Sequence, residues 1–550
     1  MFTVKIKYKD KLYAYPKDTS MLEISSNMEK DYQYKIIIGS VNNKIVDLNH
    51  QVDRDCEVNF YDLSYIDGNR AYERGLLFLY IKAVKEVLKS SVLIEHSIDR
   101  GIYTEIVTKE KLTEEDLKLV ENKMQELVNL KIPFEKLSIL RLDAISYYET
   151  NQQLDKAENL KYISNTYVNL YKFKEMYDYF YGEMPIDSSY LDNFKLTLVE
   201  PKGIVLRYPN LFIKNKIADY VPREKLFTEF RDYHCWCRKI GVSNATDLNK
   251  YISLGKIGDL IYLSEIDQSR RLLKIVKEIN EREKIKVVLI AGPSSSGKTT
   301  TSKKLALYLK SFGKNPYSLS IDDYFYDREK TPKKPNGEYD FESTEAVNRD
   351  LFNDHLKRLL NCEEVLIPTY NFITGKSEDK NKCLKLEEND ILIIEGLHAL
   401  NEQFSASIPR ENKYKIYLSP LTSLNLDNHN RISTTDNRLL RRIIRDNRTR
   451  GYNASKTLGS WLRVRVGEEK YVFPYQEEAD VVFNTSLVYE LGVLRLYTEP
   501  LLFSVKEDDP NYGEALRLIN LLRNILPITS SKIPLDSILR EFIGDSYFKE

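Results

Sequence analysis

One stretch of eight residues combines glycine, serine, lysine and threonine in a spacing that suits phosphate binding. It reads Gly-Pro-Ser-Ser-Ser-Gly-Lys-Thr and covers positions 292–299. In the pattern G-x-x-x-x-G-K-[ST], backbone N–H groups face a phosphate, and glycine lets the backbone come close. Lys298 is suited to neutralise the β- and γ-phosphate oxygens, and the Thr299 hydroxyl to ligate Mg²⁺. The residues expected to bind the nucleotide are Gly292, Ser294, Ser295, Ser296, Gly297, Lys298, Thr299 and Thr300.

Two apolar runs predict the strands that position this loop. Residues 287–290 are expected to form a buried strand before the loop, and residues 300–310 to form a helix after it. A second strand, 391–394, ends at Glu395. An acidic residue at the carboxyl end of a neighbouring strand reaches the magnesium site in such a sheet, so Glu395 is predicted to be a metal ligand. The alternative is that Glu395 is only a surface carboxylate at the end of a strand. The phosphate loop in the same sequence favours the metal role.

Two adjacent aspartates suggest which reaction the loop serves. A strand over 317–321 leads into Asp322 and Asp323. A carboxylate at this point is expected beside the γ-phosphate, where it can accept the proton of an attacking hydroxyl. This chemistry indicates a kinase rather than a GTPase or a motor. One aspartate is the base and the other an exposed turn residue, and the sequence alone leaves the choice open.

Seven motifs in order resemble the uridine kinase/phosphoribulokinase family. They are GPSSSGKTT, SIDDYF, YDFESTEAV, IPTYNF, IIEGLHAL, RLLRRIIRDNRTRG and ADVVF. The resemblance implies a P-loop fold with a parallel sheet flanked by helices, a small β-hairpin over the nucleoside and an arginine-bearing lid. It also implies ATP and Mg²⁺ as cofactors and the 5′-hydroxyl of a nucleoside as the acceptor.

The resemblance further implies a role for individual residues. Asp322 matches the carboxylate that activates the 5′-hydroxyl. Asp340 matches an aspartate near the ribose hydroxyls, and Tyr370 an aromatic residue beside the base. The expected catalytic residues are Asp322, Lys298, Arg445 and Arg450; the substrate-binding residues are Asp340, Tyr370 and Arg442; the metal ligands are Thr299 and Glu395.

A basic stripe supplies the predicted lid. It holds Arg438, Arg441, Arg442, Arg445, Arg448 and Arg450. Residues three and four apart share a helix face, so most of these arginines lie on one side. Asp446 is expected to offset little of this charge. A nucleic-acid patch and a salt-bridged helix face are the alternatives, and the phosphate lid is favoured because a phosphate loop precedes it.

Four positions depart from the uridine kinase pattern. Gly375 stands where those kinases place a histidine that contacts the pyrimidine, and Asn371 replaces the aspartate of the same motif. Tyr452 replaces a substrate arginine, and Ser460 a glutamine. We therefore expect a broad or non-uridine base preference, with ribose recognition kept.

The N-terminal half resembles part of threonyl-tRNA synthetase. Residues 1–62 resemble its small β-grasp (TGS) module, and 63–239 resemble its second additional domain. The two editing histidines read Arg74 and Phe78 here, so the editing site is expected to be lost. The predicted fold class is multidomain α+β and α/β. A helical connector (240–283), a P-loop kinase domain (284–495) and a helical C-terminal segment (496–550) complete the expected order.

The composition excludes some classes of protein. The 550 residues hold 82 Lys+Arg and 82 Asp+Glu, which leaves no net charge to attract nucleic acid or membrane. Five cysteines give no disulfide framework. We expect a cytoplasmic protein with a nucleoside substrate and no membrane partner; nucleic-acid binding is not favoured, and a homo-oligomer stays open. The alternatives to a nucleoside kinase are a kinase of another small alcohol, such as a sugar phosphate, and a nucleotide-sensing, translation-linked regulator.

Overall fold

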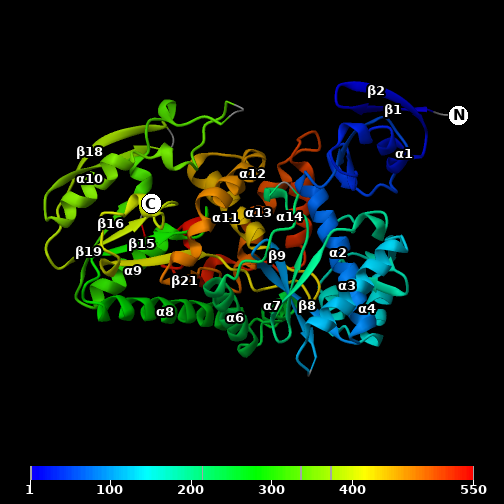
Figure 1. Ribbon diagram of the computed structural model, residues 1–550, viewed down its shortest axis with the longest axis horizontal. Helices are drawn as coiled ribbons and strands as arrows, with labels where there is room; N and C mark the ends of the chain where they lie inside the picture. The colour runs from blue at the N-terminus through cyan, green and yellow to red at the C-terminus, as the bar shows by residue number, and fades with distance from the viewer. Residues whose placement is uncertain (1–2, 109, 214, 335–336, 372–373, 549–550) are drawn as a thin grey trace.

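The computed structural model describes residues 3–108, 110–213, 215–334, 337–371 and 374–548 (Figure 1). The chain runs from a small N-terminal sheet at one end of the molecule to a parallel sheet at the other, with helices of the C-terminal half between them. Within the described ranges, no helix is both long and apolar enough to cross a membrane.

The first region is a five-stranded sheet. Its strand order is β2-β1-β7-β4-β5, with β1 and β7 parallel and the other neighbours antiparallel. Side chains of β1 alternate between exposed and buried, as expected when one sheet face covers a core. The assignment of this region as a β-grasp module stays a prediction. The strand and helix bounds are β1 Thr3–Tyr8, β2 Lys11–Pro16, β3 Thr19–Ser20, α1 Met21–Ser26, β4 Ile38–Val41, β5 Lys44–Val46, β6 Gln51–Val52 and β7 Cys56–Tyr61.

A mixed region follows, built around the long helix α2 (Ile66–Val87). A four-stranded sheet of order β13-β14-β9-β8 and a three-stranded sheet of order β10-β11-β12 accompany it. The bounds are β8 Ser91–Ile98, β9 Gly101–Val107, α3 Glu114–Asn129, β10 Glu135–Leu140, α4 Arg141–Thr150, α5 Leu154–Lys161, β11 Tyr167–Phe173, β12 Met176–Asp178, β13 Lys195–Glu200 and β14 Gly203–Arg207. Three helices then lead into the C-terminal half: α6 Glu224–Lys239, α7 Ala245–Ser253 and α8 Ile257–Glu281.

The C-terminal half contains a five-stranded sheet of order β16-β19-β15-β20-β21 in which all neighbours are parallel. Strands β15 and β20 are buried along their whole length, because helices cover both faces of a parallel sheet. The predicted parallel sheet flanked by helices is confirmed. The bounds are β15 Val287–Ala291, α9 Lys298–Ser311, β16 Asn315–Ser320, α10 Arg349–Leu360, β17 Val365–Asn371, β18 Lys376–Leu384, β19 Asp390–Glu395, β20 Lys413–Ser419, α11 Thr434–Arg450, α12 Ala454–Tyr471, β21 Val481–Asn484, α13 Glu490–Phe503, α14 Tyr512–Leu522 and α15 Arg540–Ile543.

Buried charges join the two halves of the chain. Lys156 and Asp178 of the N-terminal half form an ion pair, and His429 Nδ1 lies 2.5 Å from the Asp178 carboxylate. Arg431 pairs with Glu73 at 2.9 Å. Breaking one partner of a buried pair leaves the other charge unpaired at a high energetic cost. The relative position of the two halves is therefore held by specific polar contacts as well as by apolar packing.

Candidate active site

The phosphate loop lies between β15 and α9, at the carboxyl edge of the parallel sheet. Gly292 is required there, because a Cβ at this position would lie 2.3 Å from the backbone oxygen of Leu418. Gly297 has φ 86° at the start of α9, a conformation that favours glycine. The Lys298 ammonium donates to the backbone carbonyls of Gly292 and Pro293 at 3.0 and 3.3 Å. It is thus held over the loop, where it can exchange these carbonyls for phosphate oxygens.

The predicted metal ligands lie close together. The Thr299 hydroxyl is 3.4 Å from Oε1 of Glu395, at the end of β19. Ser320, at the end of β16, donates to the same oxygen at 3.1 Å. Burial, and then the neighbouring Asp322 carboxylate, raises the pKa of Glu395 to about 7. Hydroxyl and carboxylate oxygens are the donors that Mg²⁺ prefers, so this set fits the metal. Within the described residues no cluster of three or more His, Cys, Asp and Glu side chains suits a metal ion.

Asp322 faces the cationic groups of the site. It follows β16, and its backbone N–H donates to the Ser320 hydroxyl at 3.3 Å. Burial raises the pKa of Asp322. The positive charges that oppose this rise belong to Lys298, Arg450 and Arg445. The structure therefore brings four sequence-predicted catalytic residues into one electrostatic cluster. The choice between Asp322 and Asp323 as the base stays a prediction.

Two arginines of the predicted lid are structural. Arg438 and Arg441 are only 1% and 0% exposed on α11. Arg438 pairs with Glu468 of α12 and donates to the Ser294 backbone carbonyl at 2.9 Å. Arg441 pairs with Glu490 at 2.6 Å. The backbone N–H of Ser294 also donates to Glu468, at 2.8 Å. Arg438 thus fastens α11 and α12 to the phosphate loop, and Arg441 fastens α11 to α13.

Three of the other four lid arginines converge on one carboxylate. Asp446 is buried and lies within ion-pair distance of Arg442, Arg445 and Arg450, at 3.1, 3.3 and 3.2 Å. The expectation that Asp446 offsets little of the positive charge is therefore wrong, because helical spacing and burial place it among three guanidinium groups. Arg442 also donates to the Ser294 hydroxyl of the phosphate loop at 2.9 Å. Burial, and then Arg450, lowers the pKa of Arg445 to about 10.

Of the three predicted substrate residues, Arg442 is on α11 and the other two lie on the hairpin and the loop near it. Tyr370 is on β17, with its ring centroid 5.5 Å from that of Phe325. Asp340 pairs with Lys334 at 3.4 Å. Their positions relative to a nucleoside stay a prediction. Phe372, the last residue of the IPTYNF motif, lies outside the described residues.

An arginine that sequence reasoning missed covers Gly375. The Arg328 backbone N–H donates to the Gly375 carbonyl at 2.8 Å, and a Cβ on Gly375 would lie 2.6 Å from Arg328 Nε. Gly375 has φ 72°, which disfavours a side chain in any case. The Arg328 guanidinium therefore lies against Gly375, the position at which the uridine kinase pattern has a histidine. Arg328 and Gly375 are 47 positions apart, and no local pattern connects them.

A second missed residue is Glu342, which follows Asp340 in the YDFES motif. Its Cβ packs against Gly467 of α12: a Cβ added to Gly467 would lie 2.5 Å from the Cβ of Glu342. Burial raises the pKa of Glu342 to about 7, and its charged neighbours include Arg442 and Asp322. It is a further carboxyl group beside the predicted base.

The C-terminal segment reaches the phosphate loop, which the sequence did not indicate. The backbone N–H of Thr300, in the first turn of α9, donates to the Glu541 carboxylate of α15 at 3.1 Å. Arg448 of α11 donates to the backbone carbonyl of Glu541 at 2.8 Å. A Cβ on Gly297 would lie 2.6 Å from Ile538. A carboxylate thus occupies the helix N-terminus at which a phosphate is expected to bind.

Comparisons with known proteins divide the chain in two. Residues 287–489 match the model of the Phosphoribulokinase / Uridine kinase family. The uridine kinase of Anoxybacillus flavithermus is 26% identical over 222 residues, which cover 40% of this chain and 96% of that protein. The threonine–tRNA ligase of Carboxydothermus hydrogenoformans is 24% identical over 226 residues in the N-terminal part, or 40% of this chain. The chain spans only 35% of that ligase.

A solved structure gives a weaker likeness. A chain from Bacillus stearothermophilus described as a possible uridine kinase is 19% identical, with a TM-score of 0.24. The match covers 36% of this chain and 89% of that one. On the strength of the family model and the curated relatives, residues 287–489 are similar to the phosphoribulokinase/uridine kinase family, and this similarity indicates a phosphotransferase with an alcohol acceptor.

Proposed function

We propose that this protein transfers the γ-phosphoryl group of ATP to the 5′-hydroxyl of a nucleoside. The observation that carries the proposal is the cluster of Asp322, Lys298, Arg445 and Arg450 beside the phosphate loop. A protein that only senses nucleotide needs the lysine but not a carboxylate that faces it. The curated relatives that match this half are uridine kinases, which supports a nucleoside acceptor.

The chain's own residues account for each part of the transfer. Asp322 accepts the proton of the acceptor hydroxyl, and its raised pKa makes it a stronger base than a free aspartate. The hydroxyl oxygen attacks the γ-phosphorus, and ADP leaves. Lys298 and the lid arginines stabilise the negative charge on the transferred group. Thr299 and Glu395 would hold Mg²⁺, which when bound neutralises phosphate charge.

The acceptor side suggests the class of base. We assign Asp340 to the ribose hydroxyls and Tyr370 to the face of the base. Arg328 beside Gly375 adds guanidinium donors, which suit carbonyl oxygens of a base. Arg328 comes from a different segment of the chain than the histidine of the uridine kinase pattern. We therefore expect the protein to accept a broad range of nucleosides, or to prefer a nucleoside other than uridine.

The remaining assignments follow the same division. We take residues 1–62 as a TGS-like module, 63–239 as a domain that has lost editing, 240–283 as a connector, 284–495 as the kinase domain and 496–550 as a C-terminal segment. A cytoplasmic location agrees with five cysteines that are all free. Kinases of sugar phosphates remain the second candidate, since they share the phosphate site.

An acceptor panel tests this proposal. Purified full chain with Mg-ATP is offered ribonucleosides, 2′-deoxynucleosides and sugar phosphates, and ADP formation is measured. We expect turnover with at least one ribonucleoside and poorer turnover with its 2′-deoxy form, because Asp340 would lose a hydroxyl partner. Turnover with sugar phosphates alone would favour the second candidate.

The Glu541 contact makes a separate prediction about ATP. Because the carboxylate occupies the helix N-terminus, Glu541→Ala should lower the KM for ATP by about two- to tenfold. Steady-state kinetics measures this, with Asp545→Ala as the control, since Asp545 is exposed in the same segment. An unchanged or raised KM would mean that Glu541 does not compete with the nucleotide.

A further inference from the structure

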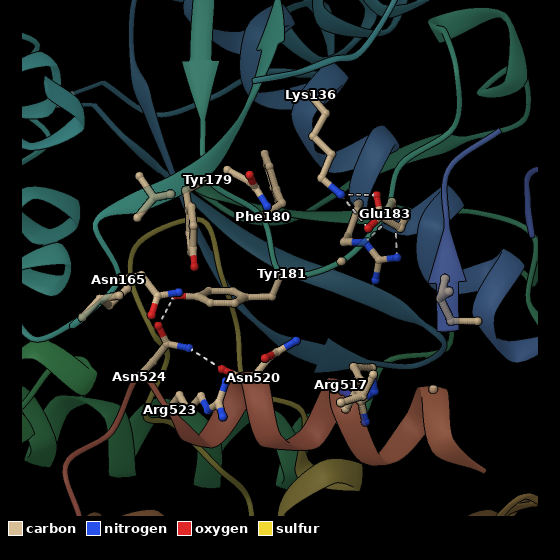
Figure 2. Close-up of a pocket in the computed structure, with 18 of the residues that line it drawn as sticks. Lys136, Asn165, Tyr179, Phe180, Tyr181, Glu183, Arg517, Asn520, Arg523 and Asn524 are labelled. Atoms are coloured by element: carbon tan, nitrogen blue, oxygen red, sulfur yellow. Dashed lines mark hydrogen bonds and ion pairs between the residues drawn. The ribbon is translucent and has the colours of Figure 1, made fainter. Parts of the chain in front are cut away.

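A cavity of about 890 Å³ lies between the N-terminal half and helix α14. Figure 2 shows it bounded by α14 on one side and by strands and loops of the N-terminal half on the other. None of the proposed catalytic residues lines it. Its volume falls in the range of small-molecule sites, about 300–1,000 Å³.

The lining of the cavity carries an excess of positive charge. Lysine and arginine outnumber aspartate and glutamate by seven to three among its lining residues. Most of this charge is balanced: Arg517 of α14 pairs with Asp436 at 2.6 Å, Arg70 with Glu514 at 2.7 Å and Arg495 with Glu499 at 3.1 Å. The excess indicates an anionic ligand, because unbalanced like charges that line a cavity repel one another.

Arg74 is the cation with most to gain from an anion. Its Nε and Nη2 donate to the Glu183 backbone carbonyl at 2.9 and 2.6 Å, and it has no ion-pair partner among the described residues. Gly182 permits this arrangement, since it has φ 123° and a Cβ there would lie 2.7 Å from Arg74 Cζ. Burial lowers the pKa of the Arg74 guanidinium. A bound anion would relieve that cost.

Lys136 adds a second cation near Arg74. Its ammonium lies 2.7 Å from the carboxylate of Glu183, the residue whose backbone carbonyl accepts from Arg74. Figure 2 shows Lys136 and Glu183 pointing toward each other at one end of the cavity. This end thus offers two donors suited to phosphate oxygens.

The other end offers flat rings and amides. The Tyr179 and Tyr181 rings meet edge to face, with centroids 4.6 Å apart. The Tyr181 hydroxyl donates to Asn524 Oδ1 at 2.5 Å, and Figure 2 places Asn165 on the other side of this pair. Aromatic faces stack on planar rings, and amides can both donate to and accept from ring substituents.

We propose that this cavity binds a nucleoside monophosphate, with its phosphate at Arg74 and Lys136 and its base beside Tyr179 and Tyr181. A phosphate alone would leave the aromatic end unused, and a nucleoside alone would leave Arg74 without an anion. The site is separate from the phosphate loop, so it can be tested whether or not the chain is an active kinase.

Equilibrium binding to the full chain tests the proposal. The Lys298→Ala variant serves as the parent, so that the phosphate loop contributes little. AMP, GMP, CMP and UMP are titrated by calorimetry into this parent, and again after Arg74→Ala is added. We expect at least one of them to bind with a Kd below about 1 mM, and Arg74→Ala to weaken that binding about tenfold or more, as loss of charge-assisted hydrogen bonds does.

Two further variants keep the result decisive. Lys136→Ala changes a more exposed side chain and should weaken binding severalfold even if Arg74→Ala fails to fold. Arg54→Ala removes an exposed arginine that pairs with its neighbour Asp53, and should leave the Kd unchanged. The proposal is overturned if none of the four monophosphates binds, or if the Kd is the same in the parent and in the cavity variants that fold.

Discussion

We expect Lys298→Ala to abolish phosphoryl transfer. The ammonium is the only side chain of the loop motif that can place a full positive charge on the β- and γ-phosphate oxygens. In the structure it rests on the Gly292 and Pro293 carbonyls, from which it can turn to a phosphate. We expect kcat with the best acceptor to fall below detection in an ADP-release assay.

Lys310→Ala is the matched control for this change. Lys310 is exposed near the end of the same helix, α9, and should be replaced without loss of turnover. Full activity of Lys298→Ala would show that this loop is not the catalytic phosphate site.

Asp322→Asn should lower kcat by roughly 10²–10⁴ with little change in ATP binding, which is the size of effect expected for a general base. The amide keeps the shape of the side chain but cannot accept the proton of the acceptor hydroxyl. Rapid-quench or steady-state measurements give kcat, and calorimetry gives the affinity for ATP.

Asp323→Asn is the comparison that decides between the two aspartates. The charges around Asp322 include Lys298, Arg445 and Arg450, and on that basis Asp323→Asn should retain most of the activity. A greater loss in Asp323→Asn than in Asp322→Asn would mean that the neighbouring aspartate is the base.

Local spacing explains what could be predicted from the sequence. The phosphate loop depends on eight consecutive residues and on the strand and helix next to them. The proximity of the two predicted magnesium ligands needed one further step, since Thr299 and Glu395 are 96 positions apart but lie at the same edge of a parallel sheet. The sheet could be inferred because its central strands are continuous apolar runs.

Contacts between distant elements could not be predicted in this way. Arg438 and Arg441 resemble the other lid arginines in the sequence, and only their burial against Glu468 and Glu490 separates them. Nothing in the periodicity connects Glu541 to Thr300, which are 241 positions apart.

The cavity of the N-terminal half shows the same limit. Arg74 and Arg517 lie at its lining only because α14 packs against the N-terminal half. The sequence predicted that the N-terminal region has lost its editing histidines. That prediction did not indicate that lysines and arginines would line a cavity there. The composition did not indicate these cations either, because the whole chain has no net charge.

The position of the transferred phosphate tests most directly whether the 5′-hydroxyl of a nucleoside is the acceptor. The full chain is incubated with Mg-ATP and its best ribonucleoside acceptor, and the product is identified by ³¹P and ¹H NMR. We expect one product, the nucleoside 5′-monophosphate, formed in equal amount to ADP and absent with Lys298→Ala. Release of ADP and inorganic phosphate with no phosphorylated nucleoside, for every acceptor offered, would contradict it.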